Sequence, residues 1–155
     1  MEIEIIQYDA KYKQYFYDYN IEWLETFFYV EAYDKEVLSK PEVYIIDKGG
    51  HIFFAKNDET ILGTVALMPT NKKGIFELTK MAVLPEARGK KIGQKLLQHC
   101  IDFAIEHQLK ALLLYSNTKL ENAIYLYRKY GFIELELEKD NPYNRADIKM
   151  LLRLS

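Results

Sequence analysis

The sequence predicts a mixed α/β fold in which a largely antiparallel sheet of about seven strands is flanked by helices. Three observations carry this prediction. Short apolar or alternating runs bounded by turn residues indicate strands, and longer stretches with apolar residues every three or four positions indicate helices. The order is one strand, helices, three strands, a helix, a strand, a helix and two strands. With 155 residues the chain has the length of one domain, which we expect to span residues 1–155.

The N-terminal third is predicted to contain one strand and two or three helices. Ile3 to Gln7 alternates enough for a short strand. The segment from about Ala10 to Phe28 lacks Gly and Pro and carries apolar residues at helical spacing, so one or two helices are expected there. Tyr33 to Ser39 indicates another short helix, which should end before Pro41 because the residue before a proline avoids helical geometry.

Three strands are expected next. Ile52 to Lys56 leads to a turn at residues 57–59, and Ile61 to Met68 is its predicted hairpin partner. A second turn at residues 71–74 contains Gly and leads to a third strand from Ile75 to Val83. These strands follow one another through short turns, which favours antiparallel pairing.

The C-terminal half is predicted to alternate helices and strands. Ala111 to Tyr115 is an apolar run suited to a buried strand. A helix from about Lys119 to Tyr130 should end at Gly131, a natural left-handed cap, before strands at Phe132 to Glu138 and Asp147 to Leu154. The helix before these elements has one apolar stripe, formed by Ile92, Leu96, Leu97, Cys100, Phe103 and Ala104.

Composition excludes several classes of site. Lys and Arg number 21 against 23 Asp and Glu, so we expect neither nucleic acid nor a membrane surface as a partner. The single cysteine, Cys100, rules out an internal disulfide and a Cys-rich zinc site, and the three His residues show no metal spacing. We therefore expect no metal. The N-terminus has no signal-peptide pattern and no segment has the apolar length of a membrane span, so a cytoplasmic protein is expected.

The segment between Pro85 and the following helix has the composition of a phosphate-binding loop. Its glycines let the backbone approach a ligand, and the helix start carries a partial positive charge. Basic side chains there disfavour the helix unless an anion is bound; the alternative is a solvated basic turn. Neither the nucleotide P-loop pattern nor the dinucleotide fingerprint is present. The loop and first helical turn comprise Arg88, Gly89, Lys90, Lys91, Ile92, Gly93 and Gln94.

Two motifs in this order resemble the GCN5-related N-acetyltransferase (GNAT) family. The first is the family's Arg/Gln-x-x-Gly-x-Gly/Ala loop, in which Arg88 and Gly93 match and Lys91 replaces the middle glycine. Lys91 keeps its N–H but would be strained if the position needs a positive φ. The second is the segment from Asn122 to Phe132, which is similar to the family's Ala-Ile-x-Leu-Tyr-x-Lys-x-Gly-Phe pattern.

The resemblance implies acetyl-CoA as co-substrate. Loop amides would grip its pyrophosphate, and backbone groups of Met81, Ala82 and Val83 would orient the pantetheine arm, with the N–H of Ala82 or Val83 at the developing oxyanion. Further coenzyme A contacts are expected from Asn117, Asn122 and Lys129. The alternatives are that both Asn residues only cap the helix and turn, and that Lys129 is a solvated cation.

The resemblance also suggests an acid and a base. Tyr127 occupies the position of the family's general-acid tyrosine, and a phenol can protonate a leaving thiolate. By spacing alone Tyr127 is a core residue beside Ala123 and Leu126, and both roles can hold together. Glu77, inside an apolar strand, is our candidate base; the alternatives are a solvent-facing carboxylate or an ordered water as base. In a regular strand Glu77 would point to the same side as Met81.

The predicted function is acetyl transfer from acetyl-CoA to a primary amine by direct attack in a ternary complex. Trp23, Glu31, Tyr33 and Asp34 lie in the segment that lines the acceptor side in the family, where carboxylates would suit a cationic amine. The acceptor is a small molecule or a protein; a homodimer is left open. A non-catalytic coenzyme A sensor on the same fold is the main alternative, and a nucleic-acid-binding protein that uses the basic loop is a weaker one.

Overall fold

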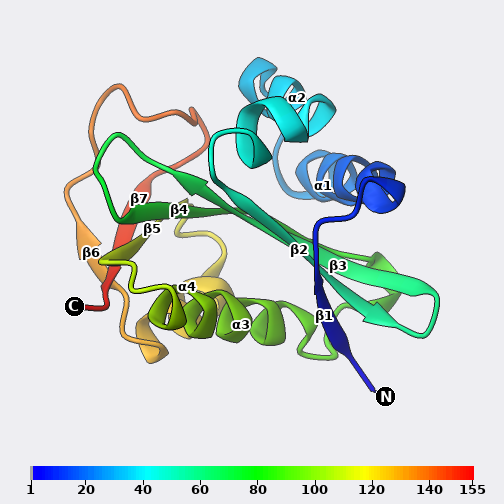
Figure 1. Cartoon of the computed structure of the whole chain (residues 1–155). Helices are drawn as coiled ribbons and strands as arrows, with labels where there is room; N and C mark the ends of the chain where they lie inside the picture. The colour runs from blue at the N-terminus through cyan, green and yellow to red at the C-terminus, as the bar shows by residue number, and fades with distance from the viewer. Residues whose placement is uncertain (1) are drawn as a thin grey trace.

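The structure of residues 2–155, a computed structural model, is a seven-stranded sheet with helices on both faces (Figure 1). The strand order is β1-β2-β3-β4-β5-β7-β6. Neighbouring strands are antiparallel except β4 and β5, which are parallel. The predicted fold class is therefore confirmed. The strands are β1 (Glu4–Gln7), β2 (His51–Asn57), β3 (Thr60–Pro69), β4 (Ile75–Val83), β5 (Ala111–Ser116), β6 (Ile133–Leu135) and β7 (Ile148–Arg153).

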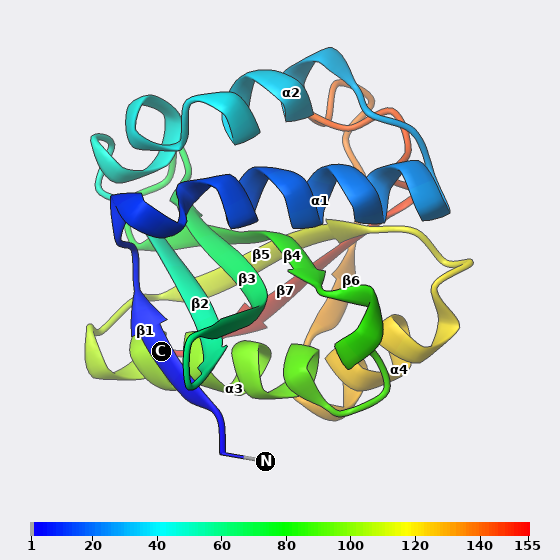
Figure 2. The same cartoon turned by 90° about the vertical axis from the view of Figure 1, so that its right-hand side faces the viewer.

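Two helices cover each face of the sheet (Figure 2). On one face lie α1 (Lys13–Phe27) and α2 (Ala32–Ser39), and on the other α3 (Ile92–Glu106) and α4 (Glu121–Lys129). Three short helices, η1 (Ala10–Tyr12), η2 (Glu42–Ile46) and η3 (Pro85–Ala87), connect these elements. Within residues 2–155 no helix is long and apolar enough to cross a bilayer.

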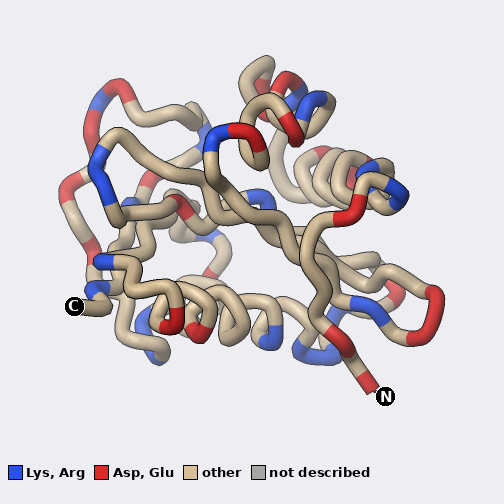
Figure 3. The backbone as a smooth tube through the Cα atoms, viewed as in Figure 1, with Lys and Arg blue, Asp and Glu red and all other residues tan. Residues whose placement is uncertain are grey.

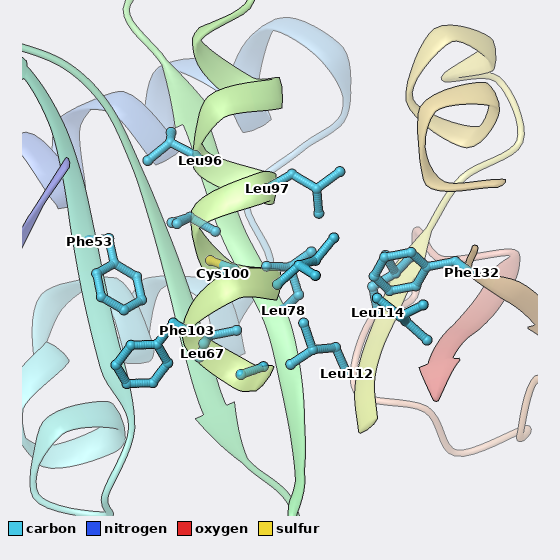
Figure 4. Packing of buried hydrophobic residues seen from close by; sticks show 14 of the residues in the cluster. Phe53, Leu67, Leu78, Leu96, Leu97, Cys100, Phe103, Leu112, Leu114 and Phe132 are labelled. Atoms are coloured by element: carbon cyan, nitrogen blue, oxygen red, sulfur yellow. The ribbon is translucent and has the colours of Figure 1, made fainter. Parts of the chain in front are cut away.

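The predicted apolar stripe of α3 forms one half of the core (Figure 4). Leu96, Leu97 and Cys100 are fully buried against the sheet. Burial raises the pKa of the Cys100 thiol, which keeps it protonated and unreactive. Phe53 of β2 packs under α3, whereas its neighbour Phe54 packs under α1, because successive strand residues point to opposite faces. Both faces of the central strands are thus buried, which explains their nearly continuous apolar sequence.

Several element boundaries differ from the predictions. The helix α2 begins one residue earlier than expected, because Glu31 and Asp34 form a capping box at its start. The π-helical turn η2 was not predicted; it follows Pro41 directly. The strand β6 ends at Leu135 rather than Glu138, so residues 136–147 form a long connection to β7. Gly131 has the expected positive φ, +102°, after α4.

Basic and acidic residues are both spread along the chain (Figure 3). A local run of basic residues follows η3, where Arg88, Lys90 and Lys91 precede α3. This local concentration of positive charge lies beside the open end of the sheet, where β4 and β5 separate.

Candidate active site

The parallel strands β4 and β5 pair over only three residues each. Ile75, Phe76 and Glu77 lie opposite Ala111, Leu112 and Leu113, and no pairing continues beyond them. The two strands therefore separate toward their carboxyl ends. A gap of this kind leaves backbone groups of both strands free to bind a ligand that enters between them.

Two neighbouring cavities occupy this opening. The first, of about 290 Å³, lies between the ends of β4 and β5 and is walled by α1 and α4; the second, of about 380 Å³, lies over the loop before α3. Val83, Arg88 and Ala123 line both cavities and so mark their junction. Of the predicted site residues, the first cavity includes Trp23, Met81, Ala82, Val83, Arg88, Asn117 and Tyr127. The second includes Val83, Arg88, Gly89, Lys91, Ile92, Gly93, Gln94 and Asn122.

The loop before α3 presents free backbone donors. Lys95 is the first residue whose amide bonds back into this turn, to the Lys91 carbonyl, so the amides of Ile92, Gly93 and Gln94 have no partner within the helix. Gly89 and Lys91 both have positive φ, +83° and +64°, a geometry that turns successive N–H groups toward one point. Together with the helix dipole, these amides form a site suited to phosphate.

Lys91 has a left-handed backbone conformation, at the position where the family motif has glycine. A side chain there costs about 1–2 kcal/mol, whereas glycine costs about 0.5–1 kcal/mol in extra unfolded-state freedom. We therefore expect Lys91→Gly to raise the free energy of unfolding by about 0.5–1 kcal/mol, measured by urea denaturation of the ligand-free protein. Lys90→Gly is the matched control, because Lys90 is not among the residues with positive φ. A gain from Lys90→Gly equal to that from Lys91→Gly would contradict the strain argument.

A bulge interrupts β4 between the predicted base and the coenzyme A segment. Thr64 pairs with Ala82 and Ala66 with Thr79, so one residue of β3 faces two of β4. Lys80 in the bulge has a φ of +57°. The expectation that Glu77 points to the same side as Met81 held only for a regular strand, and the bulge removes that condition: Met81 packs into the core cluster under α3, whereas Glu77 bonds to Tyr143 on the opposite side.

The bulge carries a buried ammonium group that is paired across the fold. Lys80 Nζ lies 3.0 Å from Asp34 Oδ1 on α2, and the two side chains are 3% and 0% exposed. Arg145, in the connection to β7, donates to both carboxylate oxygens of Asp34, at 2.6 and 3.0 Å. Burial alone would raise the pKa of Asp34, but the Arg145 hydrogen bonds and the Lys80 charge hold it below its usual value.

Glu31 belongs to the same ion-pair network. Its carboxylate accepts from Arg145 Nη1 at 3.0 Å and from the backbone amides of Asn144 and Arg145. Glu31, Asp34 and Tyr33 do not line either cavity. Of the four predicted acceptor residues only Trp23 does, and the two carboxylates are already neutralised by Arg145 and Lys80.

Glu77 is buried and hydrogen-bonded. Its Oε2 accepts from the Tyr143 hydroxyl at 2.6 Å, and Tyr143 in turn lies 3.1 Å from Thr79 Oγ1. Burial raises the pKa of Glu77, against the lowering effects of the Tyr143 hydrogen bond and the Lys80 charge. A carboxylate with a raised pKa is suited to accept a proton near neutral pH.

Tyr127 lies at the inner wall of the first cavity. Its ring packs 5.7 Å from Phe132 and against the core cluster, which agrees with the apolar face of α4. Burial raises the pKa of Tyr127 to about 12, so the hydroxyl keeps its proton at neutral pH. The side chain therefore combines a packed ring with a protonated hydroxyl, and Tyr127 lines the cavity.

The remaining predicted residues have different surroundings. Asn117 lines the first cavity, but its side chain bonds the Arg145 carbonyl and the Lys119 amide, as expected for a turn-capping residue. Lys90 and Lys129 are exposed and line neither cavity. Arg88 crosses the cleft and pairs with Glu22 on α1.

Sequence reasoning missed Lys80 and Tyr143 as site residues. Both line the first cavity, as does Arg145. A lysine inside an otherwise apolar strand was a usable signal for Lys80, since buried charges occur only with partners. Tyr143 lies in an irregular connection where no periodicity exists, so the sequence carried no comparable signal for it. Within residues 2–155, His, Cys, Asp and Glu side chains form no group of three that could hold a metal ion.

Sequence comparison gives matches of one kind. The profile of the Acetyltransferase (GNAT) family matches residues 7–132. An IAA acetyltransferase of Azospirillum brasilense is 34% identical over 101 residues, which are 65% of this chain and 61% of that protein. An uncharacterised N-acetyltransferase of Schizosaccharomyces pombe is 32% identical over 93 residues, 59% of this chain and 57% of that protein. The matched segment thus spans less than two thirds of these curated relatives.

Structural comparison extends over the whole chain. An acetyltransferase of the GNAT family from Staphylococcus aureus has a TM-score of 0.86 at 25% identity, with 99% of this chain and 100% of that chain covered. The PaiA N-acetyltransferase of Thermoplasma acidophilum, solved in complex with coenzyme A, has a TM-score of 0.77 at 20% identity, with 99% of both chains covered. At 20% identity, the comparison with the Thermoplasma acidophilum protein shows a shared fold and no more.

Proposed function

The chain belongs to the acetyltransferase (GNAT) family, and we propose that it transfers an acetyl group from acetyl-CoA to a primary amine by direct attack. The observation that carries this proposal is the opening between β4 and β5, which has a phosphate-type loop at one end and Tyr127 among the residues that line it. Acetyl-CoA supplies an electrophilic thioester carbonyl when bound, so the protein needs no nucleophile of its own.

The residues of the opening fit acetyl-CoA. The free amides of Ile92, Gly93 and Gln94 and the left-handed positions Gly89 and Lys91 suit its pyrophosphate. The cavity between the strands, of about 290 Å³, has Leu78 and Leu114 on facing strands, which suits a pantetheine arm. Asn122, at the start of α4, lines the second cavity and is a further proposed contact to coenzyme A. Lys90 and Lys129 lie outside the cavity, and we propose that they contact phosphate groups of coenzyme A that extend beyond it.

One backbone amide is best placed for the developing oxyanion. The Leu84 amide donates to the Leu62 carbonyl, toward β3. Because amides of successive strand residues point to opposite edges, the Val83 amide faces the opening. Between the two candidates, Ala82 and Val83, this geometry favours Val83 as the donor to the thioester oxygen in the transition state.

We assign Tyr127 as the acid that protonates the leaving thiolate and Glu77 as the final proton acceptor. Burial keeps Tyr127 protonated and makes Glu77 a stronger base, so each group is in the state that its role requires. The acceptor amine would enter past Trp23 and Phe27 on α1, opposite the β4 bulge. No free carboxylate lines this cavity, which supports an acceptor without a second positive charge.

The test is a panel of amines incubated with the protein and acetyl-CoA, with free thiol measured over time. The panel should compare aromatic and aliphatic monoamines, amino acids, a polyamine and a lysine peptide. We expect amine-dependent thiol release, fastest with a monoamine that has an apolar body. Coenzyme A binding without thiol release from any amine would contradict catalysis and favour the sensor function instead.

A further inference from the structure

Tyr143 stands between the proposed base and the cavity. Glu77 does not line the first cavity, whereas Tyr143 does, and the Tyr143 hydroxyl lies 2.6 Å from Glu77 Oε2. Glu77 and Tyr143 are only 9% and 3% exposed. An amine bound in the cavity can therefore contact Tyr143, whereas Glu77 lies behind it.

The hydrogen bonds of Tyr143 leave room for one more partner. A phenol has one proton and two lone pairs. Its proton goes to Glu77, because an ionised carboxylate only accepts; Thr79 Oγ1, 3.1 Å away, then donates to one lone pair. The second lone pair is free to accept a hydrogen bond from an N–H group in the cavity.

The ring of Tyr143 is fixed from several sides. Lys80 Nζ and the Arg145 guanidinium each lie 4.7 Å from its centroid. The rings of Tyr33 and Tyr115 pack on it at centroid distances of 5.9 Å. The ion pairs with Asp34 hold Lys80 and Arg145 in place. These two cations contact the ring of Tyr143 and so help to keep its hydroxyl directed toward Glu77.

We propose that Tyr143 is a catalytic residue that relays the acceptor's proton to Glu77. This inference rests on the proposed acetyl transfer. As the amine nitrogen bonds to the acetyl carbon, its N–H bond breaks and the proton passes to Tyr143 Oη. In the same step the Tyr143 O–H bond breaks and that proton passes to Glu77 Oε2. Tyr143 ends neutral and Glu77 ends as the carboxylic acid. As the thioester C–S bond breaks, the leaving thiolate takes the Tyr127 proton and Tyr127 ends as a phenolate. Before the next turnover Glu77 loses its proton to solvent and Tyr127 regains one from solvent.

The concerted form of the relay suits the high pKa of Tyr143. Burial and the Glu77 charge raise that pKa well above its usual value, so a free phenolate does not form. A hydroxyl that gains one proton while it loses another needs no such state. The relay also explains how a carboxylate behind the cavity wall can act as a base.

The first test compares Tyr143→Phe, Glu77→Gln and the double variant. Each single change should lower kcat about 100-fold or more, and the double variant should be no slower than the worse single variant, because both break one relay. Coenzyme A affinity should stay at the wild-type level. The matched control is Tyr8→Phe, which removes another tyrosine–carboxylate hydrogen bond, to Glu42, outside both cavities; it should keep the wild-type kcat.

Two further measurements avoid reliance on variant turnover. For the wild type, the rate in H₂O/D₂O mixtures should curve with deuterium content, as two protons move in one step; a straight line means one proton. In the ligand-free protein, Tyr143→Phe should raise the Glu77 pKa further, followed by carboxyl-carbon NMR, because the lost hydrogen bond favoured the charged form.

The outcomes separate the relay from the proposed function. If the wild type turns over and Tyr143→Phe has the same kcat, the relay is overturned and acetyl transfer stands. The same conclusion follows if the kcat losses of the two single variants multiply in the double variant. It also follows if the rate falls linearly with deuterium content. No thiol release by the wild type with any amine overturns the proposed function, and the relay falls with it.

Discussion

Replacing Tyr127 by phenylalanine is expected to lower kcat about 100- to 1,000-fold while coenzyme A affinity is unchanged. The ring is part of the packed face against Phe132, and phenylalanine keeps that packing. Only the hydroxyl of this cavity-lining residue is lost, and with it the proposed proton for the leaving thiolate. Initial rates by thiol release and a coenzyme A titration measure the two quantities.

The control for this variant lies on the same helix. Tyr125 is 70% exposed and lines neither cavity, so Tyr125→Phe should leave kcat within twofold of the wild type. The acid assignment is contradicted if Tyr127→Phe turns over at the wild-type rate. Parallel losses of kcat and coenzyme A affinity would instead mean that the hydroxyl supports the fold of the cavity.

Replacing Asp34 by asparagine is expected to lower the free energy of unfolding by about 3–5 kcal/mol, because it leaves two cations without their shared buried partner. Lys80 is 3% exposed at its side chain and Arg145 15%, so solvent cannot replace the carboxylate. Urea denaturation at pH 7 measures the change. Glu36→Gln, which breaks an exposed pair with Lys40 on the same helix, should cost less than about 0.5 kcal/mol.

The pH dependence has a defined sign. The pKa of Asp34 is lowered in the folded protein, so its stabilising contribution is present above the unfolded value of 3.8 and is lost as pH falls through the folded value. The difference in unfolding free energy between wild type and Asp34→Asn should therefore shrink below pH 4. A loss under 1 kcal/mol at pH 7 would contradict the view that this network holds α2 and the 136–147 connection to the sheet.

Local patterns predicted most of the elements. The stripe on α3 and the β2–β3 hairpin depend on residues close in sequence, where periodicity and turn chemistry decide the structure. The family motif has glycine at Lys91, and the sequence therefore raised the question of a positive φ there; the structure shows one, +64°. Of the loop residues expected at the site, all but Lys90 line the second cavity; their contact with coenzyme A stays a prediction.

The acceptor side was not predictable to the same degree. The contact of Lys80 with Asp34 joins residues 46 apart, and that of Arg145 with Asp34 joins residues 111 apart. No local pattern encodes such pairs. The β4 bulge also had no local pattern in the sequence, because the position of its one extra residue depends on how β4 pairs with β3. The bulge places Glu77 and Met81 on opposite sides of the strand. Glu31 and Asp34, which were expected to contact the acceptor, belong instead to the ion-pair network with Lys80 and Arg145.

The most direct test of the account is an amide NMR titration of the ¹⁵N-labelled protein with coenzyme A. The account predicts that the largest chemical-shift changes fall on Gly89, on Lys91 to Gln94 and on Val83, which line the two cavities. Asn57 to Glu59, in the β2–β3 turn, should not shift. Saturable shifts that leave the 89–94 amides unaffected, or no shifts at millimolar coenzyme A, would contradict the central claim.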